Sequence, residues 1–179
     1  DWVRTITSNL VASDDRASTL VADPSDGSLY VAGSAESDFL IVKYNPSGDS
    51  VWTARFVEPG TDGGIPAAMS IDSSGNVLIT GMSSDDFTTV KYSSSGIEQW
   101  VRRYNGPEGY DDQPTALTVD ASGNVYVTGS SYSSLGGYDI ATVKYSPGGL
   151  QLWSARYNGT GSDDDAPAGL GVDSLGNVY

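Results

Sequence analysis

Apolar and polar positions follow a strand pattern along the chain, and residues 116–157 show it most clearly. ALTVD at 116–120 is short and apolar, which is typical of a strand buried on both faces. VYVTG at 125–129 alternates apolar and polar side chains, as a half-exposed strand does. Two further strands are predicted at 140–145 and 150–157. Tight-turn sequences follow the first and third strands, so the pattern predicts one four-stranded antiparallel sheet in about 50 residues.

This pattern returns along the whole chain, with four independent markers that keep the same period. The markers are a Trp, a Lys-Tyr pair, an Asp that opens a Gly-containing turn, and an Arg three residues after the Trp. They occur at Trp2, Trp52, Trp100 and Trp153; at Lys43-Tyr44, Lys91-Tyr92 and Lys144-Tyr145; at Asp23, Asp72, Asp120 and Asp173; and at Arg55, Arg103 and Arg156. Repeats of this length are typical of propeller blades, and no segment has helical spacing with caps.

The repeats predict an all-β fold, a β-propeller of four-stranded antiparallel blades with about 3.5 repeats of about 50 residues. One four-stranded sheet has two apolar faces and cannot bury both alone, so blades pack face to face. Trp2, Trp52, Trp100 and Trp153 are expected to be structural residues between neighbouring blades. In each Lys-Tyr pair we expect a solvated Lys and a packed Tyr.

The repeats also predict the organisation of the chain. The whole of 1–179 is expected to form one partial propeller, divided into the last strand of a blade, three blades and the first two strands of a further blade. These parts are 1–16, 17–65, 66–113, 114–165 and 166–179. Three assemblies remain open: a fragment of a longer protein, an arc that self-associates head to tail into a ring, and a small four-bladed ring. The chain has no initiator Met and no signal peptide, which favours a processed or shortened chain.

Composition excludes several kinds of chemistry. The chain has no Cys and no His, which rules out disulfides, thiolate nucleophiles, a Ser-His-Asp triad and His-ligated zinc within it. The net charge of −14 argues against nucleic acid as a partner, because phosphate binding needs a basic surface. No apolar run is long enough for membrane insertion.

The repeated residues resemble the bacterial SBBP (seven-bladed β-propeller) repeat. The third copy carries the similarity from Asp120 to Gly129 (DASGNVYVTG), from Asp139 to Tyr145 and at Trp153. The second copy matches at 72–81, 87–92 and Trp100, whereas the first departs, with Ser28 where Asn is expected. The resemblance implies a scaffold or recognition module of a secreted or cell-surface bacterial protein, and thus an extracellular location.

A second, weaker resemblance concerns the stretch before each Trp. Residues 44–52 are similar to the tryptophan-docking stretch of pyrroloquinoline-quinone propellers, and the Gly-x-x-x-Trp spacing recurs at 96–100 and 149–153. In that family the Trp is a packing device, so the similarity implies blade geometry and no cofactor. A quinoprotein-like or lyase-like propeller enzyme remains an alternative hypothesis.

Most of the acidic residues fall in the links after the second and fourth strands, which lie on one face of a propeller. The plainer interpretation is that acidic loops keep the protein soluble. The alternative is Ca²⁺, which takes six to eight oxygen ligands. Candidate ligands are Asp14, Asp15, Asp62, Asp111, Asp112, Asp163, Asp164 and Asp165. Their order matches no EF-hand loop. Paired carboxylates of a glycosidase could come from the same face.

Three aromatic side chains in the longer loops are candidate ligand-binding residues. Tyr110, Tyr132 and Tyr138 could serve as platforms for sugars. The sequence therefore favours a non-catalytic scaffold or interaction module that binds a protein or a glycan. Ca²⁺-dependent recognition of carbohydrate or protein is the alternative.

Overall fold

The computed structural model describes residues 15–36, 38–58, 64–134, 137–161 and 163–179. These residues form strands β1 to β12, and the described part of the chain contains no helix. The strands are β1 (Arg16–Ala22), β2 (Leu29–Ala35), β3 (Asp38–Tyr44), β4 (Ser50–Phe56), β5 (Gly64–Ile71), β6 (Val77–Ser83), β7 (Asp86–Tyr92), β8 (Glu98–Tyr104), β9 (Asp112–Val119), β10 (Val125–Ser133), β11 (Gly137–Tyr145) and β12 (Gln151–Tyr157).

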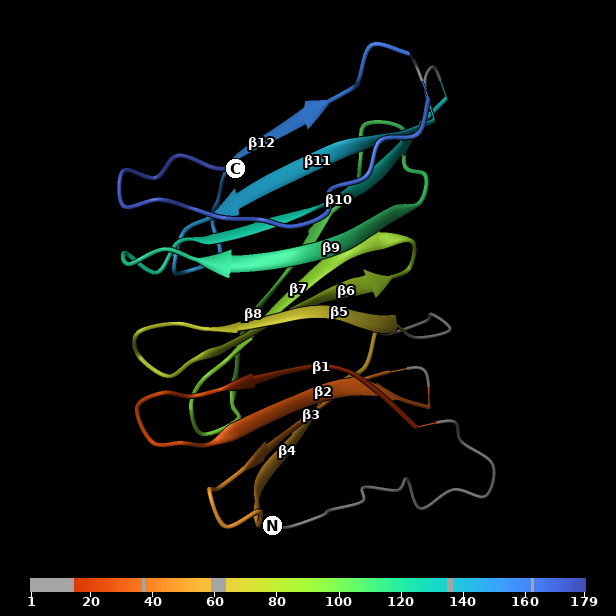
Figure 1. Cartoon of the computed structure of the whole chain (residues 1–179). Helices are drawn as coiled ribbons and strands as arrows, with labels where there is room; N and C mark the ends of the chain where they lie inside the picture. The colour runs from red at the N-terminus through yellow and green to blue at the C-terminus, as the bar shows by residue number, and fades with distance from the viewer. Residues whose placement is uncertain (1–14, 37, 59–63, 135–136, 162) are drawn as a thin grey trace.

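The strands form three four-stranded antiparallel sheets, each in the order of the sequence: β1 to β4, β5 to β8 and β9 to β12. The fold class predicted from the repeats is therefore confirmed. Figure 1 shows the sheets side by side as blades, with the first strands β1, β5 and β9 next to one another. No helix in the described residues has the length and apolar character needed to span a membrane.

A turn of Asp, Gly and Asn joins the first two strands of a blade. In the second blade, Asp72 Oδ1 accepts hydrogen bonds from the backbone N–H of Ser74 at 2.9 Å and of Asn76 at 3.0 Å. Gly75 has a φ of 75°, which favours glycine. The same contacts recur at Asp120. Short polar side chains and one glycine thus set where each blade begins its second strand.

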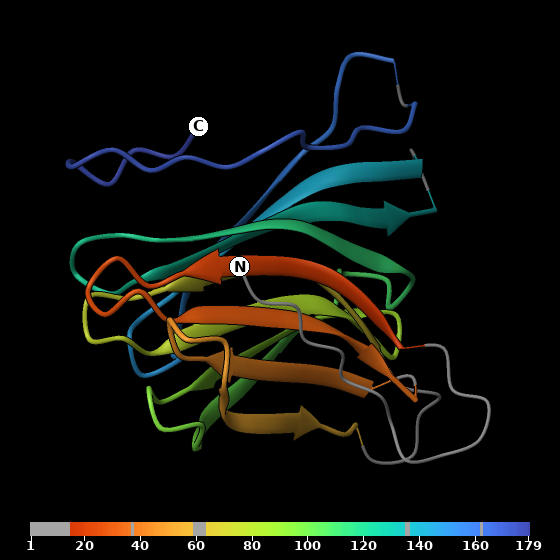
Figure 2. The ribbon, with the colours of Figure 1, turned by 60° about the horizontal axis from the view of Figure 1, so that its bottom comes forward.

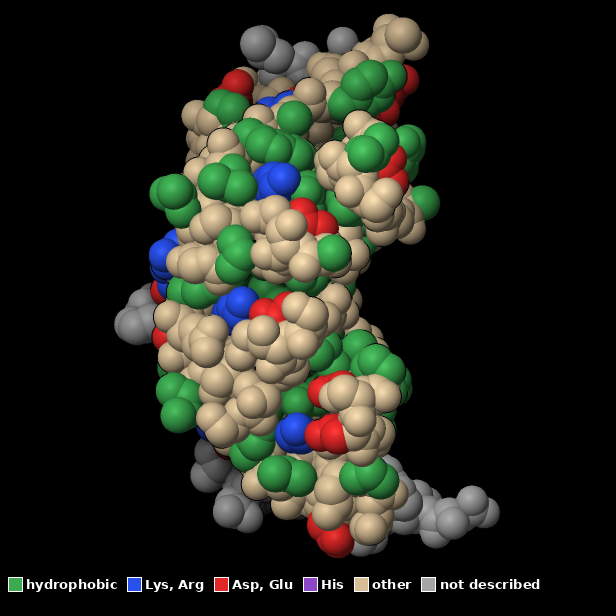
Figure 3. Space-filling model, turned by 90° about the vertical axis from the view of Figure 1, so that its left-hand side faces the viewer, with side chains coloured by type: hydrophobic (Ala, Val, Ile, Leu, Met, Phe, Trp, Pro, Cys, Tyr) green, Lys and Arg blue, Asp and Glu red, His purple; other side chains and the backbone are tan. Residues whose placement is uncertain are grey.

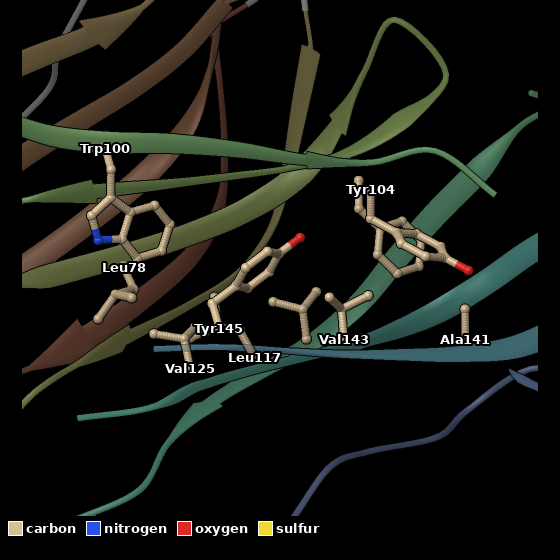
Figure 4. Packing of buried hydrophobic residues seen from close by; sticks show 10 residues of the cluster. Leu78, Trp100, Tyr104, Leu117, Val125, Ala141, Val143 and Tyr145 are labelled. Carbon is tan, nitrogen blue, oxygen red and sulfur yellow. The ribbon is translucent and has the colours of Figure 1, made fainter. Parts of the chain in front are cut away.

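Two apolar clusters hold the three sheets together. One lies between the first and second sheets and includes Phe39, Phe56 and Tyr92. The other lies between the second and third sheets, and Figure 4 shows Trp100 and Tyr104 from β8 near Val143 and Tyr145 of β11. Each cluster is filled by side chains from the two sheets that it joins, so a single sheet could not bury its apolar faces alone.

The repeated tryptophans dock onto the next blade. Trp52 donates from Nε1 to the carbonyl oxygen of Ser94, and Trp100 donates to that of Pro147, both at 3.0 Å. Each acceptor lies in the turn between the third and fourth strands of the following sheet. The structural role expected for these two residues follows from this contact, which joins consecutive blades at their outer strands.

The other two tryptophans differ. Trp100 is 7% exposed, whereas Trp153 on β12 is 37% exposed, and no described strand beyond β12 covers it. A place for Trp153 between two blades therefore stays a prediction. Trp2 lies outside the described residues.

Residues after β12 form a fourth hairpin beside the third sheet (Figures 1 and 2). Val172 and Val178 form an isolated antiparallel bridge, and Gly171 and Tyr179 exchange two backbone hydrogen bonds of 2.9 Å. Asp173 closes the turn between them as Asp120 does in the third blade. This hairpin repeats the first turn of a blade.

Candidate functional site

The third blade departs from the repeat at the hairpin between its second and third strands. The corresponding last pairs are Ala35 with Asp38 in the first blade and Ser83 with Asp86 in the second. In the third blade, Ser131 pairs with Asp139, and the ladder then continues through two more pairs. Strands β10 and β11 accordingly have 9 residues each, whereas β6 and β7 have 7. The first two blades have no counterpart of this extension, which comprises the pairs Tyr132–Tyr138 and Ser133–Gly137.

Two of the three candidate tyrosines lie on this extension, and the third packs on them. Tyr132 and Tyr138 are direct cross-strand partners, with ring centroids 5.2 Å apart and planes at 75°. Tyr110, from the loop between β8 and β9, meets Tyr132 at 5.4 Å and 85°. Both are edge-to-face contacts, a favourable aromatic geometry. Tyr110, Tyr132 and Tyr138 form what is called here the tyrosine cluster, in which the Tyr110 side chain is 50% exposed.

Backbone contacts fix the loop that carries Tyr110. The N–H of Tyr132 donates to the carbonyl oxygen of Asp111 at 3.0 Å, and the N–H of Ser134 donates to Glu108 Oε2 at 2.7 Å. Hydrogen bonds from Ser134 lower the pKa of Glu108, so this acceptor is charged at neutral pH. The loop is therefore tied to the hairpin on both sides of Tyr110, which limits its motion before any ligand arrives.

Polar groups surround the tyrosine cluster. Gln113 donates from Nε2 to the Tyr138 hydroxyl at 3.3 Å, and Asp164 Oδ1 accepts from the Tyr138 N–H at 2.9 Å. Burial raises the pKa of the Tyr138 hydroxyl, and the carboxylates of Asp111 and Asp164 raise it further. Aromatic faces, amide and hydroxyl donors and carboxylate acceptors thus meet at one place on the surface.

Two of the candidate calcium ligands are structural caps. Asp112 Oδ2 accepts from the N–H of Gly106 at 2.5 Å, and Asp165 Oδ2 accepts from that of Gly159 at 2.6 Å. Asp112 is fully buried. Each aspartate holds the loop that leads from the last strand of one blade to the next blade. From the sequence alone, this structural role could not be distinguished from that of a calcium ligand.

The other candidate ligands are dispersed. Asp111 and Asp164 lie by the tyrosine cluster, while Asp163 and Asp15 are exposed elsewhere in their loops. Asp14 and Asp62 lie outside the described residues. Across the ranges that the structure describes, no three acidic side chains come together as a metal site. Calcium binding stays a prediction.

The repeated arginines pair with acids at the same end of the blades. Arg156 donates to Asp139 Oδ2 at 2.8 Å, and Arg55 donates to Asp38 Oδ2 at 2.7 Å. Arg103 departs, because it pairs with Glu58. Burial raises the pKa of the equivalent acid, Asp86, and the nearby carboxylate of Asp112 adds to this effect.

Glycosidases use two carboxyl groups, one of them a general acid with a raised pKa and the other an ionised carboxylate. Burial raises the pKa of Asp112 as well as that of Asp86. However, Asp112 has no exposed surface and its Oδ2 is bound to a backbone N–H. A substrate cannot reach it in this arrangement, so this pair lacks the access that catalysis requires.

Sequence reasoning found the three tyrosines but missed the groups that organise them. Gln113 and Glu108 gave no signal of their own, because single polar residues in loops are common. One signal was present, namely the greater length of the third link between second and third strands. Because the blade structure fixes the length of each repeat, extra residues in one repeat point to a role that the other repeats do not share.

Comparison with protein families identifies the repeat. Residues 99–136 match the family model described as the SBBP beta-propeller repeat. This stretch runs from β8 through β9 and β10 into the extended hairpin, and it includes Tyr110 and Tyr132. The resemblance seen in the sequence is thereby confirmed. A search of curated protein sequences finds no match.

Solved structures support the fold. A protein of unknown function from Bacteroides caccae aligns with a TM-score of 0.56 and 14% identity, over 92% of this chain and 52% of its own. An engineered GH43 glycoside hydrolase with endo-xylanase and exo-arabinofuranosidase activity aligns with a TM-score of 0.53 and 14% identity, over 90% and 33%. The chain thus spans about half of the first protein and a third of the second. At this identity the likeness shows the fold alone.

Proposed function

We propose, from the premise that residues 99–136 match the SBBP beta-propeller repeat and that the described strands form propeller blades, that the chain is a non-catalytic carbohydrate-binding module. Its binding surface is the tyrosine cluster. The observation that carries the proposal is the extended hairpin of the third blade, which places Tyr132 and Tyr138 outside the repeat and against Tyr110. Repeated positions serve the blades, whereas these positions have no structural counterpart in the other two.

Carbohydrate suits the chemistry of the cluster. A tyrosine offers an apolar ring face and a polar hydroxyl, and a sugar likewise offers an apolar ring face and polar hydroxyls. Gln113 and the nearby aspartates supply donors and acceptors for those hydroxyls. The half-exposed ring of Tyr110 is the accessible part of this surface.

Catalysis is not part of the proposal. The chain has neither His nor Cys, and the described acid with the strongest burial, Asp112, caps a loop. The glycosidase activity named for the GH43 structure belongs to that enzyme, and 14% identity does not transfer it. An extracellular or cell-surface position, which the repeat's resemblance implies, completes the proposal.

The test is a glycan array probed with the wild-type protein and with Tyr110→Ala. We expect binding to one glycan class, and a loss of affinity of about 10-fold or more in the variant, as for an aromatic anchor. Tyr179→Ala is the matched control, because Tyr179 is 76% exposed and lies in the fourth hairpin. Equal binding by wild type and Tyr110→Ala would refute the proposed surface.

A second arm repeats the array with a chelator. Loss of binding in EDTA would support the Ca²⁺-dependent alternative, in which Asp111 and Asp164 are the candidate ligands nearest the cluster. Unchanged binding would remove calcium from the mechanism. A structural propeller without a sugar ligand would bind no glycan in either condition.

A further inference from the structure

Two carboxylates act directly on the tyrosine cluster. Asp111 follows Tyr110 directly, and Asp164 is hydrogen-bonded to the backbone of Tyr138. Both aspartates are exposed, and both carboxylates act on the Tyr138 hydroxyl, whose pKa they raise in addition to burial. Negative charge therefore lies beside the ring faces that a ligand would meet.

The basic side chains of this part of the molecule, Arg156 included, are paired with other groups. Arg156 pairs with Asp139, Arg103 pairs with Glu58, and Lys144 lies over the ring of Tyr126. Within the described ranges, no basic side chain makes a hydrogen bond or cation–π contact with a member of the tyrosine cluster. Arg156 lies nearby but is paired with Asp139, and among the described residues no ion pair joins a basic side chain to Asp111 or Asp164.

We propose that the tyrosine cluster selects amino sugars that carry a free, protonated amine. This inference rests on the proposed function and adds the ligand class. A cation is attracted to the face of an aromatic ring, and a nearby carboxylate adds to that attraction. Asp111 and Asp164 supply the carboxylates, and Tyr110 supplies the exposed ring. The same charges repel uronates and sulfated sugars.

The packing of the rings decides where the amine binds. Ring centroids only 5.2 and 5.4 Å apart mean that the three rings contact one another and leave no room for a cation between them. The ammonium group therefore meets the outer side of the cluster, where the aspartates are. A sugar ring fits such a surface better than a compact quaternary amine, which needs an enclosing cage.

The experiment compares three neutral or cationic oligosaccharides of equal length by calorimetry in slightly acidic buffer of low ionic strength. These are the β-1,4 oligomers of glucosamine, N-acetylglucosamine and glucose. We expect the wild type to bind the glucosamine oligomer at least about tenfold more tightly than the other two, and to lose this preference in high salt. Equal affinity for all three would overturn the inference and leave the proposed function standing.

Two variants separate the contributions. Asp111→Asn with Asp164→Asn should lower the affinity for the glucosamine oligomer far more than the affinity for the acetylated oligomer, and so abolish the preference for the free amine. Asp49→Asn with Glu98→Gln removes the same charge near the turns at the other end of the strands, and should preserve the preference. If this control pair lowers the preference equally, net charge and not the site is responsible, and the inference fails.

A basic peptide distinguishes sugar recognition from simple charge. We expect oligo-lysine of matching charge to bind weakly and to compete poorly with the glucosamine oligomer. If it binds as tightly and displaces the sugar, the surface is a general cation-binding face and the inference is wrong. If no oligosaccharide binds at all, the proposed function itself fails.

Discussion

A buried ion pair links turn and strand in the second blade. Lys91 Nζ lies 2.8 Å from Asp72 Oδ2, and their side chains are only 4% and 6% exposed. The expectation of a solvated Lys in each Lys-Tyr pair is therefore wrong for this residue. Lys43 is buried too, and pairs with Asp26, because the first blade has a different turn. Removing one member of a buried pair leaves the other charge uncompensated.

We expect Asp72→Asn to lower the free energy of unfolding by about 3–5 kcal/mol, since Lys91 would stay buried without its counter-ion. Urea denaturation measures the change. The matched control is Asp173→Asn, which alters the same turn in the exposed fourth hairpin and should cost far less. Similar losses in both variants would show that the turn, and not the ion pair, is what matters.

The same residue contributes to acid sensitivity. Burial alone would raise the pKa of Asp72, but the hydrogen bonds from Lys91 and Asn76 outweigh it and lower the pKa below 3.8. The unfolded chain therefore takes up this proton first as pH falls. The stability that Asp72 contributes is complete above 3.8 and is lost as pH falls through the folded value. The Asp72→Asn variant should lack this part of the acid-induced loss.

At the scale of elements, two consecutive blades are joined where the indole ring of one blade packs against a glycine in a turn of the next. A Cβ atom on Gly149 would lie 2.9 Å from Cδ2 of Trp100, and on Gly96 it would lie 2.8 Å from Cδ2 of Trp52. Both glycines also have positive φ, at 82° and 81°. The Gly-x-x-x-Trp stretch at 96–100 therefore serves two contacts. Its glycine packs against the Trp of the preceding blade, and its own Trp docks on the following blade.

We expect Gly149→Ala to destabilise the protein by at least about 1–2 kcal/mol, because the residue is left-handed and the methyl group meets Trp100. Gly148→Ala is the matched control next to it, since a Cβ at Gly148 has nothing within 4 Å. Thermal unfolding followed by Trp fluorescence measures both. If the two variants melt together, the docking contact adds nothing.

At the scale of the whole molecule, the outer face of the third blade is exposed among the described residues. Tyr157 on β12 is 61% exposed, whereas the equivalent Phe56 and Tyr104 are 7% and 8% exposed in the first two blades. Trp153 shares this face. Figure 3 shows a different side, the one with the tight turns, where acidic and basic side chains lie next to one another. Two large aromatic side chains are thus exposed on one blade face, which favours association.

Self-association through this face stays a prediction. We expect light scattering to give a mass above 18.7 kDa that rises with protein concentration. Tyr157→Lys should lower that mass, because it places a charge on the apolar face. Leu150→Lys is the control, since Leu150 is 68% exposed and lies in the turn before β12. A constant monomer mass for the wild type would contradict the prediction.

The fold could be predicted from the sequence because every marker returns once per blade and the register of one blade fixes the others. The site could be predicted only in part. Tyr110, Tyr132 and Tyr138 stood out as loop aromatics, but their contact depends on two extra residue pairs in one hairpin. The aspartates could not be sorted, because Asp111 and Asp112 are neighbours of identical chemistry and only one of them is buried.

The docking of each tryptophan onto the following blade has a consequence for biosynthesis. The carbonyl oxygen that accepts the Trp52 hydrogen bond lies 42 residues further along the chain, and the one that accepts from Trp100 lies 47 residues further along. As the polypeptide leaves the ribosome, from its N-terminus onward, a blade can pair its strands before its outer indole has anything to bind. We therefore expect each blade to be completed by the emergence of its successor, so that folding of the array follows the direction of translation.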